Sequence, residues 1–186
     1  MHIPTDKQQL VQLESGDVIH SFWVASLSPK QDLIPGQIHH IWMSSDKPGL
    51  FLGNCAEFCG VQHAWMRIMV EAHPQEEFDA WEKQQAESAP EPTTESAIRG
   101  KQLFMDLICA NCHAIKGTEA QGRAAPDLTH LATRGWLGSG TIENTPENLR
   151  LWLKNPQAIK PGSHMPDLKL TDSQVNDISN YLETLK

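Results

Sequence analysis

Two short motifs concentrate the residues of this chain that can bind metal ions. The first motif holds two thiols, an imidazole and a thioether, at Cys55, Cys59, His63 and Met66. Soft donors of this kind select copper or zinc over magnesium or calcium. The chain has four cysteines, and the other two, Cys109 and Cys112, belong to the second motif. No cysteine is left for a structural disulfide, so we interpret both motifs as metal or cofactor sites.

The first motif alone leaves three kinds of metal site open. A zinc ion would complete a tetrahedron with Cys55, Cys59, His63 and one further histidine. A mononuclear blue-copper site uses one cysteine, two histidines and a weakly bound methionine, so the motif has one thiolate too many. Two metal ions that share bridging sulfurs would use both thiolates, two imidazoles, the methionine and a backbone carbonyl. His20 could supply the second imidazole, although a histidine among apolar residues is usually a packed core residue.

The second motif, Cys109-Ala110-Asn111-Cys112-His113, has the spacing of covalent c-type haem attachment. Two thioether bonds would hold the porphyrin, and His113 would be the proximal iron ligand. A redox-active thiol pair of the thioredoxin type is the alternative, but the adjacent histidine and the absence of a βαβ pattern argue against it. Met165 is the expected sixth ligand, with the neighbouring His164 as its rival. Methionine ligation raises the reduction potential of a haem.

The elements that must position the first motif are short strands. Segments rich in β-branched and aromatic residues, or with alternating apolar residues, are separated by turn signals and by no long helix. This pattern favours a β-sandwich or barrel. The expected strands cover residues 10–13, 17–24, 38–44, 50–52 and 66–70.

A change of composition predicts a domain boundary after the strands. Pro74 opens an expected helix that ends near Gln85. Residues 86–95 have two prolines and no apolar periodicity, as in a solvated linker. Beyond them the apolar residues follow helical spacing, and the last helix opens on a capping box from Thr171 to Gln174. We therefore predict domains of residues 1–85 and 96–186, joined by a linker of residues 86–95.

Composition limits the possible partners. No run of about 18 apolar residues is present, so no segment of this chain is expected to span a membrane. The net charge of −8 argues against nucleic acid as a partner and favours a basic one.

The pattern Cys55-x-Glu57-x-Cys59-Gly60-x-x-His63-x-x-Met66 resembles the dinuclear copper A centre of cytochrome c oxidase subunit II. The segment from Asp17 to Phe22 is similar to the other histidine segment of that family, and the resemblance continues in order from residue 2 to residue 85. It implies a cupredoxin-like Greek-key sandwich. It also implies six ligands for two copper ions, namely His20, Cys55, Glu57, Cys59, His63 and Met66.

The resemblance assigns a role to each of these ligands. The two thiolates would bridge the copper ions, and each imidazole would bind one of them. Met66 would be a weak ligand on one copper ion, and the backbone carbonyl of Glu57 would bind the other. The carboxylate of Glu57 is a candidate ligand for a magnesium ion at the interface with subunit I.

Residues 96–186 resemble an all-α class I cytochrome c, with one haem held by Cys109 and Cys112 and ligated by His113 and Met165. The resemblance implies that the Pro126 carbonyl orients His113 through its other ring nitrogen. Met105 and His130 are interpreted as packing or surface residues. Both halves together resemble subunit II of bacterial oxidases that carry a fused cytochrome c.

This resemblance implies serial one-electron transfer. An external donor, either a cytochrome c or a quinol–cytochrome c reductase, would reduce the haem. The electron would pass to the copper pair and then to haems in subunit I, where oxygen is reduced to water and protons are pumped. The chain would be the electron-entry part of this proton-translocating enzyme, without an oxygen site of its own.

The resemblance also implies a place in the cell. Both domains would face the periplasm or outer surface of the bacterial cytoplasmic membrane, in contact with subunit I and other subunits. The family's membrane anchor, a two-helix hairpin, and the first strands of its β-domain would lie before Met1, so this chain is expected to be a truncated part of such a protein.

Two other functions remain open at this stage. Copper A centres also occur in nitrous oxide reductase and in some nitric oxide reductases, so the final acceptor could be a nitrogen oxide. A copper carrier or metallochaperone would instead have a mononuclear site. A quinol oxidase subunit without copper is disfavoured because every copper ligand is retained.

Overall fold

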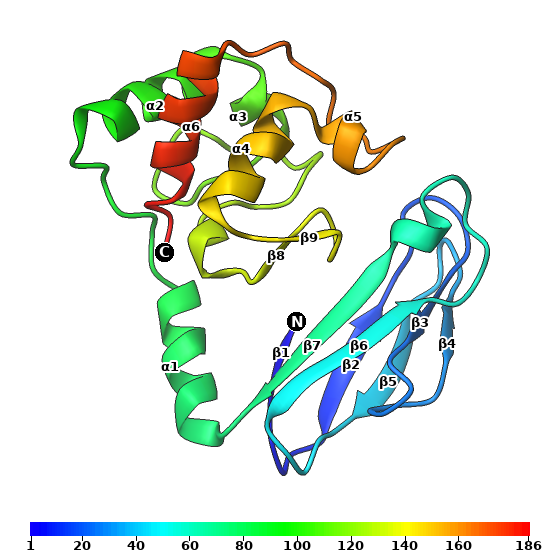
Figure 1. The fold of residues 1–186 in the computed structure, drawn as a ribbon. Helices are drawn as coiled ribbons and strands as arrows, with labels where there is room; N and C mark the ends of the chain where they lie inside the picture. Colours follow the sequence, from blue (N-terminus) through cyan, green and yellow to red (C-terminus); the bar gives the residue numbers. More distant parts are fainter. The chain divides into compact units, whose positions relative to one another are not determined.

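The computed structural model describes residues 1–186, which form two compact units, Met1–Gln84 and Gln85–Lys186. No helix in either unit has the length and apolar character needed to cross a lipid bilayer. Figure 1 shows strands in the first unit and mostly helices in the second. This confirms the predicted order of a β-sandwich domain followed by a helical domain.

The first unit contains two sheets. The larger sheet has the strand order β1-β7-β6-β3-β4, in which β1 and β7 are parallel and the other neighbours are antiparallel. Its strands are β1 (His2–Pro4), β3 (His20–Trp23), β4 (Gln31–Leu33), β6 (Gly49–Cys55) and β7 (Arg67–His73). The smaller sheet pairs β2 (Gln9–Leu13) with β5 (His39–Met43). Buried side chains from both sheets, including Phe22, Val70, Ile41 and Met43, form one core.

Two strands of the larger sheet were not predicted. The expected strands include neither β1 at His2–Pro4 nor β4 at Gln31–Leu33. Both are three-residue strands at the two edges of the sheet. Such short segments give almost no alternation to detect, and proline is tolerated at an edge. The predicted strand at residues 50–52 is longer in the structure and continues to Cys55.

The second unit packs its first long helix, α2 (Glu95–Asp106), against its last, α6 (Asp172–Leu182). Its other helices are α3 (Cys109–Cys112), η2 (Leu131–Thr133), α4 (Pro146–Lys154) and α5 (Pro156–Ile159). Thr171 and Gln174 form the predicted capping box. A small hairpin of β8 (Trp136–Leu137) and β9 (Ile142–Glu143) departs from the all-α expectation. It turns through Gly138, Ser139 and Gly140, which all have positive φ.

The helix α1 (Gln75–Gln85) follows β7 and agrees with the helix expected after Pro74. Part of the predicted linker makes contacts within the second unit. The Ala89 amide donates to the Lys116 carbonyl at 3.0 Å, and Ala89 packs against the core there. The boundaries of the linker, residues 86–95, stay a prediction.

Candidate metal centres

Strand pairing brings His20 next to the first cysteine motif. In the pair β3–β6, Phe22 lies opposite Cys55, and the Ala56 amide donates to the Ser21 carbonyl at 2.9 Å. His20 begins β3 and Cys55 ends β6, so both lie at the same end of the sheet. The Nδ1 atom of His20 is 3.8 Å from the Cys55 sulfur, although 35 positions separate the residues.

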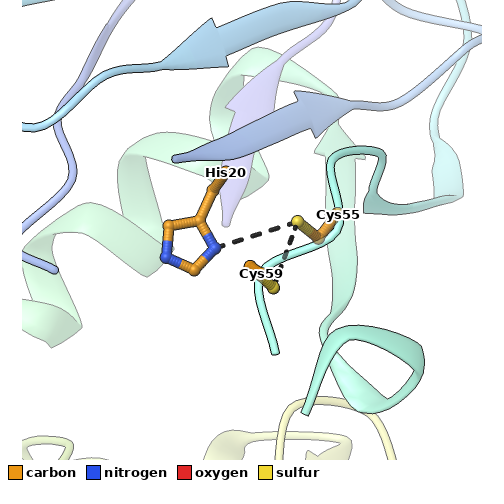
Figure 2. A group of neighbouring side chains, drawn as sticks. All are labelled: His20, Cys55 and Cys59. Carbon is orange, nitrogen blue, oxygen red and sulfur yellow. Dashed lines mark hydrogen bonds between the residues drawn. The ribbon is translucent and has the colours of Figure 1, made fainter. Parts of the chain in front are cut away.

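The loop after β6 folds back so that its other donors follow in a row. The Cys59 sulfur is 3.8 Å from the Cys55 sulfur, and Figure 2 shows both thiols beside the His20 ring. The short helix η1 (His63–Trp65) then places Nδ1 of His63 3.7 Å from the Cys59 sulfur. Each thiol therefore has its own imidazole neighbour.

The two remaining predicted donors lie close to this row. The Cys55 thiol donates to the Glu57 carbonyl at 3.2 Å. Met66 lines the same hollow as His20 and Cys55, and its carbonyl accepts a hydrogen bond from the Cys55 amide at 3.0 Å. The side chain of Glu57 is exposed, and it belongs to no group of three or more His, Cys, Asp or Glu side chains whose donor atoms lie within 4.8 Å of one another.

The surroundings of the thiols favour loss of a proton from Cys55. Burial opposes its ionisation, but backbone hydrogen bonds and the His20 imidazole outweigh this effect and lower the pKa of Cys55 to about 6. Burial and the adjacent Cys55 thiol raise the pKa of Cys59. Burial lowers the pKa of His20, but the hydrogen bond to Asp17 at 2.8 Å and the adjacent Cys55 thiol together outweigh this effect and raise that pKa. One thiolate is therefore available near neutral pH, and thiolates are the metal-binding form of cysteine.

The arrangement fits a pair of soft metal ions better than one tetrahedral ion. Only the donor atoms of His20, Cys55 and Cys59 lie within 4.8 Å of one another, so His63 stands outside this group. A single zinc ion needs four ligands around one point. Two adjacent thiols, each with its own imidazole, present donors to two ions that share sulfurs.

The second unit places the haem-attachment residues on a single helical turn. Cys109 and Cys112 are both free thiols at the ends of α3, and burial raises the pKa of Cys109. His113 follows directly, and its Nδ1–H donates to the Pro126 carbonyl at 2.7 Å. This bond leaves Nε2 of His113 as the nitrogen that can bind a metal.

Met165 is held in place by side chains that sequence analysis did not single out. The indole N–H of Trp152, on α4, donates to the Met165 sulfur at 3.1 Å. The side-chain amide of Gln157, on α5, donates to the Met165 carbonyl at 2.7 Å. Met165 packs against the core of the unit, whereas its rival His164 is exposed.

His130, interpreted from the sequence as a packing or surface residue, is buried in the second unit. Its side chain is 5% exposed, and neither ring nitrogen has a hydrogen-bond partner. An unsatisfied buried polar group costs about 1–3 kcal/mol. No periodicity or motif in the sequence points to this histidine.

The fold and the two sites define a two-domain redox metalloprotein, in which a thiolate–imidazole centre on a β-sandwich precedes a c-type haem site on a helical domain. Residues 1–73 match the family described as "Cytochrome C oxidase subunit II, periplasmic domain", and residues 97–186 match the cytochrome c family. The chain thus joins a domain of the cytochrome c oxidase subunit II family to a cytochrome c domain.

Two relatives align with this chain over almost its whole length. The chain is 37% identical to cytochrome c oxidase subunit 2 of Alkalihalophilus pseudofirmus over 100% of its own length, and 34% identical to that of Bacillus subtilis over 99%. It covers 54% of each relative, so it spans about half of their length. The solved periplasmic domain of subunit II of cytochrome oxidase from Bradyrhizobium japonicum is 37% identical, with 45% of this chain and 60% of that chain covered and a TM-score of 0.44.

Proposed function

We propose that this chain is the electron-entry part of a haem–copper oxygen reductase. The observation that carries the proposal is the row of alternating donors, in which the two thiols are 3.8 Å apart and each contacts one imidazole. The same chain carries a c-type haem motif, Cys109 to His113, and Met165 as a candidate second ligand for the iron. The matched families and the names of the relatives support this assignment.

In this proposal six residues hold a dinuclear copper A centre, namely His20, Cys55, Glu57, Cys59, His63 and Met66. The two thiols lie in a row between the imidazoles, and their thiolates would be shared by the metal ions. Met66 and the Glu57 carbonyl complete the set as weaker donors. Asp17 fixes the ring of His20 through Nε2, which leaves Nδ1 directed at Cys55. The exposed carboxylate of Glu57 is free to reach a magnesium ion at a contact with subunit I.

Four residues hold the haem in this proposal. Cys109 and Cys112 would attach it covalently, and His113 and Met165 would be its iron ligands. The Pro126 carbonyl fixes the orientation of His113, and Trp152 holds the thioether of Met165. When bound, the haem and the copper pair supply reversible one-electron transfer within a rigid polypeptide.

The proposed path leads from an external donor to the haem, then to the copper pair and to the haems of subunit I, where oxygen is reduced. We further propose domains of residues 1–85 and 96–186, with the residues between them as a tether. A tether keeps the haem domain at high effective concentration near the copper domain, so no diffusible cytochrome is needed for this step. The proposed location is the periplasmic or outer face of the bacterial cytoplasmic membrane.

Metal analysis with electron-spin-resonance spectroscopy tests the copper assignment. We expect two copper ions and one iron per chain, and a seven-line spectrum from one electron shared over two copper nuclei. Cys59→Ser removes one bridge and should abolish this spectrum, whereas His40→Ala, a change at an exposed histidine on β5, should leave it intact. One copper ion with a four-line spectrum in the unmodified chain would support a copper carrier instead and refute the proposal.

A further inference from the structure

A second cluster of metal-binding side chains lies at the edge of the larger sheet. In the parallel pair β1–β7, His2 lies opposite Glu71 and Pro4 lies opposite His73. Alternate residues of a strand share one face, so Glu71 and His73 point to the same side of β7. The pairing thus gathers His2, Glu71 and His73 on one face, from segments about 70 positions apart in the chain (Figure 1).

The donor atoms of this cluster face a common point. Nδ1 of His2 is 2.8 Å from Nε2 of His73. One carboxylate oxygen of Glu71 lies 3.9 Å from that nitrogen of His2 and 3.8 Å from that of His73. All three side chains are partly buried, at 24%, 39% and 22% exposure for His2, Glu71 and His73. The site is therefore open enough for an ion to enter and a water molecule to bind.

The spacing of the donors is close to what a metal ion requires. A tetrahedral zinc ion with ligands at about 2.0–2.2 Å sets its ligand atoms about 3.3–3.5 Å apart. The three observed separations of 2.8, 3.8 and 3.9 Å lie on both sides of this value. Small side-chain rotations would make them equal without any movement of the backbone.

Neighbouring residues supply the support that histidine ligands usually have. Nδ1 of His73, the nitrogen turned away from the cluster, lies 3.9 Å from a carboxylate oxygen of Glu77 on α1. A carboxylate on the second ring nitrogen orients a metal-binding histidine and makes it more basic. The ring of Trp81, also on α1, stacks on His2 with a centroid separation of 4.2 Å. Each imidazole thus has a neighbouring side chain from α1, Glu77 beside His73 and Trp81 beside His2.

We propose that His2, Glu71 and His73 bind one divalent transition-metal ion, such as zinc, with water as the fourth ligand. Two imidazoles and one carboxylate form a donor set of borderline softness, suited to zinc rather than to calcium or magnesium. The site is distinct from the thiolate centre. His73 and Cys55 lie at opposite ends of the antiparallel pair β6–β7, in which Gly49 pairs with Ala72 and Asn54 with Arg67. This separation is about 20 Å at the usual rise of a strand.

The bound ion would fasten the edge of the sheet. The strand β1 has three residues and pairs only with β7. An ion bound by residues of β1 and β7, with Glu77 of α1 beside His73, would connect these three elements at the edge of the sheet. Because the ion binds the folded first unit, it raises the unfolding temperature of that unit, and the increase grows with the logarithm of the free zinc concentration above the dissociation constant.

Isothermal titration calorimetry with zinc chloride tests the site. The chain should first be loaded with copper and haem, so that no thiol is free, and then cleared of loosely bound metal. We expect one zinc ion per chain. His73→Asn and Glu71→Gln should each weaken binding at least tenfold, and Glu77→Gln should weaken it by about 10–100-fold. His40→Ala is the matched control, since it removes an exposed histidine of the same domain and should leave zinc binding unchanged.

Two outcomes would overturn the proposal. Absence of a zinc site in the loaded chain would show that the imidazoles only share a hydrogen bond. Binding that survives His73→Asn but is lost on acetylation of the Met1 amino group would assign the ion to the chain terminus. The isosteric Glu71→Gln variant and the copper spectrum of each variant distinguish loss of the site from loss of the fold. These measurements do not depend on oxidase activity or on the proposed electron path.

Discussion

Gly100 is a glycine of the haem domain at which an added Cβ atom would come too close to a backbone atom of a neighbouring helix. It lies in the middle of α2, where α2 crosses α6. A Cβ atom at this position would stand 1.9 Å from the Asp177 carbonyl oxygen and 2.9 Å from Cβ of Tyr181. The first contact is with backbone, so no side-chain rotation relieves it. Gly100→Ala therefore forces the two helices apart by more than 1 Å, the distance that restores an ordinary contact.

The cost follows from the packing on both sides of the crossing. Ala97 and Phe104 of α2, and Ile178 and Tyr181 of α6, are each at most 2% exposed. Overpacking a well-packed core costs typically 1–3 kcal/mol, and we expect about 3 kcal/mol here because a backbone atom is displaced. For a domain of about 100 residues, each kcal/mol lowers the melting temperature by about 4–8 °C. The expected decrease is thus about 12–24 °C.

Thermal unfolding of the haem-loaded chain, followed by circular dichroism and by haem absorbance, measures this decrease. Gly135→Ala is the control, because a Cβ atom there would meet nothing within 4 Å and the backbone is unstrained. Because alanine is a better helix former than glycine by about 1 kcal/mol, Gly100→Ala would stabilise α2 if no close contact opposed it. If Gly100→Ala melted within about 2 °C of the control, or higher than the unmodified chain, the close crossing of α2 and α6 would be refuted.

Four further substitutions test the charge pairing and the metal sites. The ion pair with Arg99 lowers the pKa of Asp177. Its stabilising effect is therefore complete above about pH 4, the pKa range of an unfolded aspartate, and is lost as the pH falls through the lower pKa of the folded state. Asp177→Asn should flatten the acid side of a plot of melting temperature against pH, and an unchanged plot would contradict the pairing. Met66→Leu should keep two copper ions by metal analysis but shift their reduction potential in voltammetry, whereas complete loss of copper would contradict a weak ligand. Met165→Ala should abolish the near-infrared methionine–iron band with the haem still attached. Trp152→Phe, which removes the N–H donor to the sulfur, should make that band disappear at a lower temperature; survival of the band in Met165→Ala would assign the ligand to another residue.

Local spacing made most of the chemistry predictable. Cys55, Cys59 and His63 fall within nine consecutive positions, so a single loop is enough to bring them together. Cys109, Cys112 and His113 lie on one helical turn and the residue after it. In both motifs the short sequence spacing keeps the donor residues close together, and the structure adds the orientation of their side chains.

Contacts between distant segments were harder to predict, because periodicity describes a segment and not its partner. The placement of His20 beside Cys55 depends on the register of β3 and β6, which no local pattern defines. The resemblance to a known family supplied that pairing. Nothing supplied the pairing of His2 with His73, because β1 is too short to give a strand signal. Nothing in the sequence pointed to the contact of Trp152 with Met165, because the indole N–H reaches the sulfur across 13 positions of the chain.

The close approach of β3 and β6 links the core of the first unit to its metal-binding loop. Gly53 is buried two residues before Cys55, and a Cβ atom there would stand 2.2 Å from the Trp23 carbonyl oxygen and 2.7 Å from Val24 Cγ2. Only glycine permits this spacing of backbones. Val24 is fully buried in the core, so the position of β6 is fixed by the core rather than by the loop. The separation of His20 and Cys55 is therefore set by the packing of the core, which keeps the two donors close together.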